Sequence, residues 1–107
     1  MEIEGSPDWV LEVVSRSSIR KDTVRLRRTY HRAGVREYWL INALDEPIDF
    51  QILLHGPEGY EPAPRRGRWQ LSRIFGRGFQ LQRTRNPRGR WNYLLLIKEF
   101  PPSRRRK

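Results

Sequence analysis

The sequence contains no cysteine and no long hydrophobic run. Without cysteine the chain has no disulfide framework, no thiolate metal site and no cysteine nucleophile, which fits a reducing compartment. No apolar run approaches the roughly 18 residues needed to span a bilayer. The start, MEIEG, is acidic where a secretory signal would be basic and then apolar. We therefore expect a cytoplasmic protein without a membrane partner.

Acidic residues are almost missing from the second half of the chain. Residues 62–107 hold fourteen Lys or Arg and one acid, a net charge of +13, whereas residues 1–61 hold eight against eleven, a net of −3. A basic block of this kind favours phosphate backbones as partners, and the planar fork of arginine suits phosphate oxygens. The alternative is a solvated basic face that reflects a biased composition.

Arginines and aromatic residues alternate within this block, as in RRGRW and RGRW. This pattern predicts nucleic-acid phosphate contacts from Arg65, Arg66, Arg68, Arg83, Arg85, Arg88 and Arg90. Trp69 or Trp91 could stack on a base, but packing within the protein is the more common role of such tryptophans. The two histidines, His31 and His55, are too few and too far apart in sequence to predict a zinc site.

The first 42 residues have the pattern of a strand, a helix and a second strand. Residues 8–14 form a short run rich in β-branched residues, and residues 36–42, REYWLIN, form another. Between them a helix over residues 19–33, ending at Gly34, presents one apolar face. That face is predicted to hold Ile19, Thr23, Leu26, Tyr30 and Ala33. We expect a βαβ unit with parallel strands.

The remaining residues read as short strands separated by turns. Among the turns, Asn86-Pro87-Arg88-Gly89 has the composition of a hairpin turn, after which residues 91–98 run back. We expect these strands to extend the parallel pair as antiparallel neighbours. Residues 1–100 are predicted to be one domain, and residues 101–107, PPSRRRK, a disordered basic tail.

The first strand carries two carboxylates, Asp8 and Glu12. Alternate residues of a strand share a face, so both acids point to the same side. They are separated by roughly 13 Å along the strand, which is too far for two ligands of one magnesium ion. Asp8 follows a proline and is more typical of a turn acceptor. Glu12 lies among apolar neighbours, where a carboxylate needs either a metal ion or an ion pair with an arginine such as Arg25 or Arg27.

The segments PDWVLEVVS and YHRAGVREYWLIN, with a basic helix between them, resemble the C-terminal half of the Uma-two family of restriction endonucleases, within the PD-(D/E)xK nuclease superfamily. The resemblance implies an α/β, restriction-endonuclease-like fold and metal-dependent hydrolysis of DNA. Glu12 would bind Mg²⁺ or Mn²⁺, with Asp8 as a secondary acid and Arg25 or Arg27 stabilising charge.

Two features of that family have no match in this sequence. The family takes a second metal-binding aspartate from an earlier strand, and Leu26 occupies the position of its helix lysine. We therefore expect a shortened domain that is either inactive or completed by a homo-oligomer or a partner chain. The alternative function is a non-catalytic nucleic-acid-binding or scaffold protein derived from a nuclease fold.

Overall fold

The computed structural model describes residues 4–6, 8–14, 20–42 and 48–100 of the 107-residue chain. The predicted tail, residues 101–107, lies outside this part. In chain order, the elements are β1 (Glu4–Ser6), β2 (Trp9–Val14), α1 (Arg20–Arg32), β3 (Glu37–Asn42), β4 (Asp49–His55), β5 (Tyr60–Pro62), β6 (Arg65–Arg66), β7 (Trp69–Ser72), β8 (Arg77–Arg85) and β9 (Trp91–Glu99).

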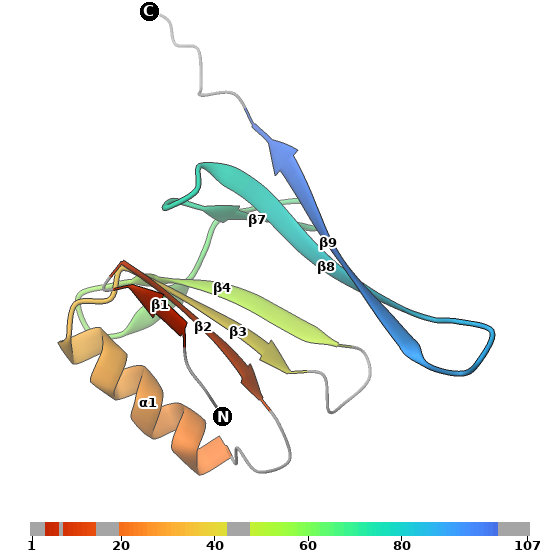
Figure 1. Ribbon diagram of the computed structural model, residues 1–107. Coiled ribbons are helices and arrows are strands. Elements are labelled where there is room, and N and C mark those ends of the chain that lie inside the picture. Colours follow the sequence, from red (N-terminus) through yellow and green to blue (C-terminus); the bar gives the residue numbers. More distant parts are fainter. Residues whose placement is uncertain (1–3, 7, 15–19, 43–47, 101–107) are drawn as a thin grey trace, which may run out of the picture.

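A five-stranded mixed sheet holds the predicted βαβ unit. Its strand order is β1-β2-β3-β4-β5. Strands β2 and β3 are parallel, as predicted, and Glu12 pairs with Leu40 in their register. Helix α1 connects them and lies on one face of the sheet (Figure 1). The observed strands begin one residue later than predicted, and strand β1, which pairs with β2 in the antiparallel sense, was not predicted.

Helix α1 ends at the predicted glycine for a clear physical reason. Gly34 has a φ of +81°, and its N–H donates to the carbonyl of His31 while the N–H of Val35 donates to the carbonyl of Tyr30. These two bonds are the Schellman motif, which needs a residue in the left-handed region. Ala33 lies in this turn and is exposed, so its predicted place on the buried face is wrong.

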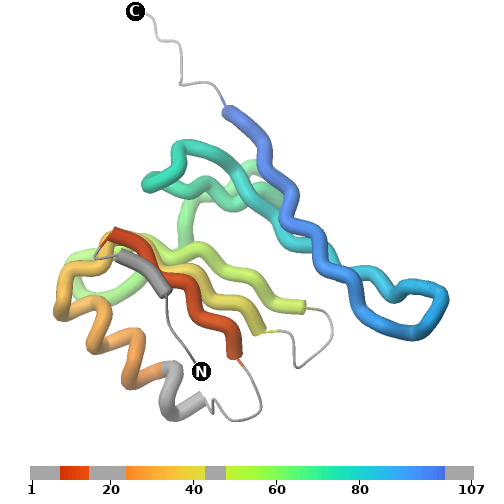
Figure 2. The backbone as a smooth tube through the Cα atoms, viewed as in Figure 1, coloured from red at the N-terminus to blue at the C-terminus, as the bar shows by residue number. Residues whose placement is uncertain are grey.

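The second half of the chain forms a separate sheet, which corrects the prediction of one extended sheet. Strands β4 and β5 do extend the first sheet, but β6, β7, β8 and β9 make an antiparallel sheet of their own. Figure 2 shows the two sheets as separate layers. The chain leaves the first sheet at Pro62-Ala63-Pro64. The N–H of Ala63 still donates to the carbonyl of Ile52, but Pro64 has no N–H to donate, and its carbonyl accepts from the N–H of Leu71 on β7 of the second sheet.

Apolar side chains cover both faces of the first sheet. The face toward the helix packs Val10, Val35, Tyr38, Leu40 and Leu53, with Val14, Tyr30 and Tyr60 at its border. The face toward the second sheet packs Trp39, Phe50, Ile52, Ala63 and Phe79. Glu12 therefore lies on the helix side, because it alternates with Leu11 and follows Val10 by two residues. In the described part of the chain, no helix has the length and apolarity to span a bilayer.

Candidate active site

Glu12 is buried in the centre of the sheet, in the middle of β2. Its exposed fraction is 0%. The hydroxyl of Tyr38, on the neighbouring strand β3, donates a hydrogen bond to its Oε1 atom. Its Oε2 atom is also buried and has no hydrogen-bond partner among the residues that the structure describes. A buried carboxylate oxygen without a partner is costly, because the hydrogen bonds it made with water are not replaced.

Tyrosines surround this carboxylate and stay in their neutral, donating form. Burial, together with the hydrogen bond to Glu12 and its negative charge, raises the pKa of Tyr38 far above its ordinary value. Burial and the charge of Glu12 also raise the pKa of Tyr30. At neutral pH the Tyr38 hydroxyl therefore acts as a donor that orients the Glu12 side chain.

Of the two arginines predicted to assist Glu12, the structure brings Arg27 to the site. Its guanidinium carbon lies 5.8 Å from the centre of the Tyr38 ring, and its Nε atom is buried without a hydrogen-bond partner within the described ranges. Arg25 is exposed on the helix. Within the described residues Glu12 makes no ion pair with either arginine.

The other predicted acid lies at the surface. Asp8 is exposed and forms an ion pair with Arg36 at 3.7 Å, in which both side chains are mostly in solvent. The backbone carbonyl of Asp8 accepts a hydrogen bond from the N–H of Glu37, where strands β2 and β3 begin to pair. Exposed ion pairs of this kind contribute little to stability. Asp8 and Glu12 are not brought together, as the spacing along the strand predicts.

The described residues do not supply a complete metal site. Among them there is no group of three or more His, Cys, Asp or Glu side chains that could hold an ion. Divalent ions such as Mg²⁺ take about six oxygen ligands, including water. The free Oε2 of Glu12 fits the role of one such ligand. Because Glu12 is fully buried, an ion reaches this oxygen only if the packing around it opens.

A positively charged cavity borders the site at Arg27. It has a volume of about 430 Å³ and lies between the second half of α1 and the turn before β5. Its lining includes Arg27, Arg28, His31, Arg32, Glu58 and Tyr60. Four of these side chains can carry positive charge and one is acidic, so the cavity favours an anion.

The arginines predicted to bind nucleic acid lie on the second sheet and its turns. Arg65 and Arg66 are on β6, Arg68 is in the β6–β7 turn, Arg83 and Arg85 are on β8, and Arg88 and Arg90 are in the β8–β9 turn. All are exposed except Arg83, which is half-buried. They could contact an anion from solvent, and none of them lines the cavity beside Glu12.

Neither tryptophan of the basic block is a free stacking platform. The guanidinium carbons of Arg83 and Arg85 lie 4.2 and 4.3 Å from the centre of the Trp91 ring. Trp69 is half-buried, and its ring centre is 6.2 Å from that of Phe100. Contacts within the protein thus occupy both rings.

A second buried carboxylate, Glu37, was missed. Its Oε2 accepts hydrogen bonds from the Trp39 indole at 2.7 Å and the Ser72 hydroxyl at 2.5 Å, and its Oε1 accepts from the backbone N–H groups of Arg73 and Ile74 at 3.0 and 3.1 Å. Glu37 is 0% exposed, like Glu12, but both of its oxygens have partners. It joins strand β3 to the turn after β7, so its role is to connect the two sheets.

The two histidines, far apart in sequence, stack on one another. The ring centres of His31 and His55 are 3.9 Å apart, and the rings are nearly parallel. His31 Nε2 lies 2.6 Å from the Gly56 carbonyl, and His55 Nε2 lies 3.0 Å from the His31 carbonyl. A carbonyl only accepts hydrogen bonds, so each Nε2 must carry a proton. No periodic signal in the sequence relates these two positions.

A family model matches most of the chain. It is Uma2, described as "Putative restriction endonuclease", and it covers residues 2–84, well beyond the segments that carry the resemblance in the sequence. No curated protein and no solved structure matches the chain. Families with this fold generally use divalent metal ions. The mixed α/β architecture with its βαβ unit agrees with the match, and the chain belongs to the Uma2 family of restriction-endonuclease-like proteins.

Proposed function

We propose that this chain contributes to metal-dependent cleavage of DNA phosphodiester bonds, with Glu12 as one ligand of a Mg²⁺ or Mn²⁺ ion. The observation that carries the proposal is the fully buried carboxylate whose Oε2 has no partner in the described part of the chain. A stabilising core residue would have both oxygens bonded, as Glu37 does. An unsatisfied buried carboxylate is retained where function requires it.

Each neighbour of Glu12 has a role in this proposal. Tyr38 holds the carboxylate through Oε1 and leaves Oε2 directed to a ligand. Arg27 supplies positive charge next to the site. The family carries a lysine one residue earlier on the helix. A guanidinium near that position stabilises the negative charge that develops on a phosphate. When bound, the metal ion polarises the phosphate and lowers the pKa of a water molecule.

The remaining metal ligands come from outside the described residues or from another chain. Asp8 is directed to solvent and pairs with Arg36, and Arg25 is exposed, so we assign neither to the site. DNA is the substrate class that the family implies. The positive cavity beside Arg27 offers a place for a phosphate next to the one that is cut.

Plasmid nicking tests the proposal. The purified chain is incubated with supercoiled DNA in Mg²⁺, in Mn²⁺ and in EDTA, beside Glu12→Ala prepared in the same way, with circular dichroism to confirm that both are folded. We expect relaxed circles from the wild type with a divalent ion and none with EDTA or with the variant. Equal nicking by the two proteins indicates a contaminating nuclease and overturns the proposal.

Replacing Arg27 should slow nicking without removing DNA binding. Arg27→Gln removes the charge beside Glu12, and the loss of one such electrostatic contact slows reactions by roughly a hundredfold. Arg25→Gln is the matched control, because Arg25 lies on the same helix, carries the same charge, is exposed and does not line the cavity. The measurement is the initial nicking rate at saturating DNA. Equal rates for the two variants would show that Arg27 acts only through the general positive field.

The second candidate function is non-catalytic nucleic-acid binding. It is favoured by the exposed arginines of the second sheet and by the incomplete set of metal ligands in the described residues. In that case the affinity for duplex DNA falls steeply with salt but is the same in Mg²⁺ and EDTA at equal ionic strength, and the same for Glu12→Ala. Fluorescence anisotropy with a labelled duplex distinguishes the two functions.

A further inference from the structure

Strand β9 is the free edge of the second sheet. Among the described residues it pairs only with β8, over the full length from Trp91 to Glu99. Figure 1 shows it on the outside of the molecule, with the β8–β9 hairpin extending away from the first sheet. A nine-residue edge strand presents unpaired N–H and C=O groups, which proteins normally protect from pairing with another chain by charged residues, prolines or bulges.

The exposed surface of this strand is apolar instead. Tyr93, Leu94, Leu95 and Ile97 are between 42% and 57% exposed. Tyr93, Leu95 and Ile97 share one face of the strand and Leu94 lies on the other, so solvent meets large apolar groups on both sides. A contiguous exposed apolar surface on a folded protein is a mark of an interaction site. These residues lie beyond the region of the family match, which ends at residue 84.

We propose that β9 pairs with β9 of a second copy of this chain, in the antiparallel sense, with Leu95 on the two-fold axis. In this register Leu95 faces Leu95 of the partner subunit, Leu94 faces the partner's Leu96, and Tyr93 faces the partner's Ile97. Every central position then has an apolar neighbour across the pair. The two four-stranded sheets become one eight-stranded sheet, and the unpaired backbone groups of both edges are satisfied.

The charges of the strand also fit a second copy in this register. The only charged residues of β9 are Lys98 and Glu99, both at its end. Lys98 faces the partner's Asn92, and Glu99 faces the partner's Trp91, so no like charges meet. The guanidinium groups of Arg83 and Arg85 lie over the Trp91 ring. The partner's Glu99 thus approaches a positive cluster one strand away.

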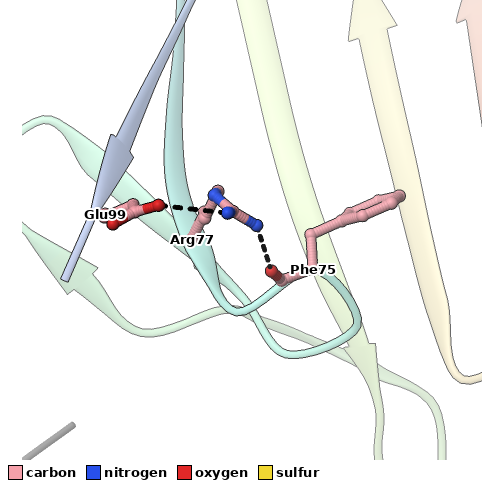
Figure 3. A network of polar contacts seen from close by, with 3 residues as sticks. All are labelled: Phe75, Arg77 and Glu99. Atoms are coloured by element: carbon pink, nitrogen blue, oxygen red, sulfur yellow. Dashed lines mark hydrogen bonds and ion pairs between the residues drawn. The ribbon is translucent and has the colours of Figure 1, made fainter. Parts of the chain in front are cut away.

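Glu99 is available for this contact. Its Oε2 accepts a hydrogen bond from Arg77 at 3.1 Å, and Arg77 also donates to the carbonyl of Phe75 at 3.3 Å (Figure 3). The Glu99 side chain is nevertheless 76% exposed. The centre of this strand, residues 93–97, carries no charge and is rich in leucine, so it offers nothing to a phosphate backbone, and nucleic acid is not the partner of this edge. The pairing is independent of the proposed nuclease function.

A cysteine cross-link tests both the dimer and its register. The chain has no cysteine, so Leu95→Cys introduces a single thiol. On the two-fold axis of an antiparallel pair the Cα atoms of residue 95 are about 4.5–5.5 Å apart, within the range for a disulfide. We expect rapid formation of a covalent dimer with diamide as oxidant. Leu94→Cys is the matched control: its thiol faces Leu96 of the partner subunit, and it should cross-link at least tenfold more slowly.

Charge variants at the same position provide the second measurement. Leu95→Lys and Leu95→Glu each place like charges on the axis and should be monomers by light scattering at concentrations where the wild type is a dimer. Mixing the two should restore a dimer, because opposite charges then face each other across the axis. A mixture of Leu94→Lys and Leu94→Glu should not. A monomeric wild type, or equal cross-linking at positions 94 and 95, would overturn the proposal.

Discussion

Glu37→Ala should lower the free energy of unfolding by about 3–5 kcal/mol, the largest stability effect expected from one substitution here. The carboxylate accepts four hydrogen bonds, from the Trp39 indole, the Ser72 hydroxyl and two backbone N–H groups. Removing it leaves these donors without a partner, and each buried donor left unsatisfied costs about 1–3 kcal/mol. The two sheets would also lose a link between β3 and the turn after β7.

Urea unfolding followed by tryptophan fluorescence measures this loss. Glu37→Gln should lower the free energy of unfolding by less than Glu37→Ala, because the amide keeps one acceptor oxygen. It should still be destabilising, because its NH₂ group faces donors that need an acceptor. Glu58→Ala, at an exposed position, is the control for removing a carboxylate and should change stability by less than about 0.5 kcal/mol. If Glu37→Ala were as stable as that control, Glu37 would not connect the sheets.

Glu12→Gln should have the opposite pattern, a loss of activity without a loss of stability. The amide oxygen can still accept the hydrogen bond from Tyr38, while the negative charge and the free Oε2 disappear. Because a buried charge without a counter-ion is costly, the free energy of unfolding should stay the same or rise by about 1 kcal/mol. The divalent-dependent nicking rate should fall by at least about a hundredfold, since a neutral amide is a poor metal ligand.

The two buried carboxylates thus make a matched pair. Both are 0% exposed, both lie on the central parallel strands, and the same Glu→Gln change is made in each. Tyr38→Phe is a further control, because it removes the hydroxyl that orients Glu12 and leaves the carboxylate with no partner at all. That variant should be less stable than the wild type. A Glu12→Gln protein that is destabilised as much as Glu37→Gln would show that Glu12 is structural.

The part of the fold that could be predicted from the sequence depends on local patterns. The parallel pair β2 and β3 follows from two apolar, β-branched runs with an amphipathic segment between them, and the helix end follows from Gly34. The β8–β9 hairpin follows from its turn residues: Asn86 Oδ1 accepts from the N–H groups of Arg88 and Arg90, and Gly89 has a φ of +81°. Each of these signals lies within a few residues.

What could not be predicted depends on contacts between distant residues. Glu37 looks like a surface acid at the start of an apolar strand, and its partners Ser72, Arg73 and Ile74 follow some 35 residues later. The same holds for the stacked His31 and His55. A short antiparallel strand has the same sequence pattern whether it joins the first sheet or starts a second one. The chain changes sheets at Pro64, whose carbonyl accepts from the N–H of Leu71 on β7, and this contact becomes visible only once the partner strand is known.

Within the candidate site, the sequence identified the residue but not its surroundings. Glu12 stands out because it interrupts an apolar strand, and the structure shows it fully buried. That Tyr38 donates to it, and that Arg27 rather than Arg25 lies nearby, depends on how the helix is rotated against the sheet. The apolar pattern places Leu26 and Tyr30 on the buried face, and both are half-buried in the structure. It gives no weight to Arg27, which is also half-buried and packs on the Tyr38 ring.

The central claim is that the free oxygen of Glu12 takes a divalent ion. Its most direct test is a titration of the wild type and of Glu12→Gln with Mn²⁺, followed by electron paramagnetic resonance of the free ion, in the presence of a DNA duplex. We predict that the wild type removes Mn²⁺ from solution beyond the amount bound by DNA alone and that Glu12→Gln does not. Equal uptake by the two proteins, or none by either, would contradict the assignment of Glu12 as a metal ligand.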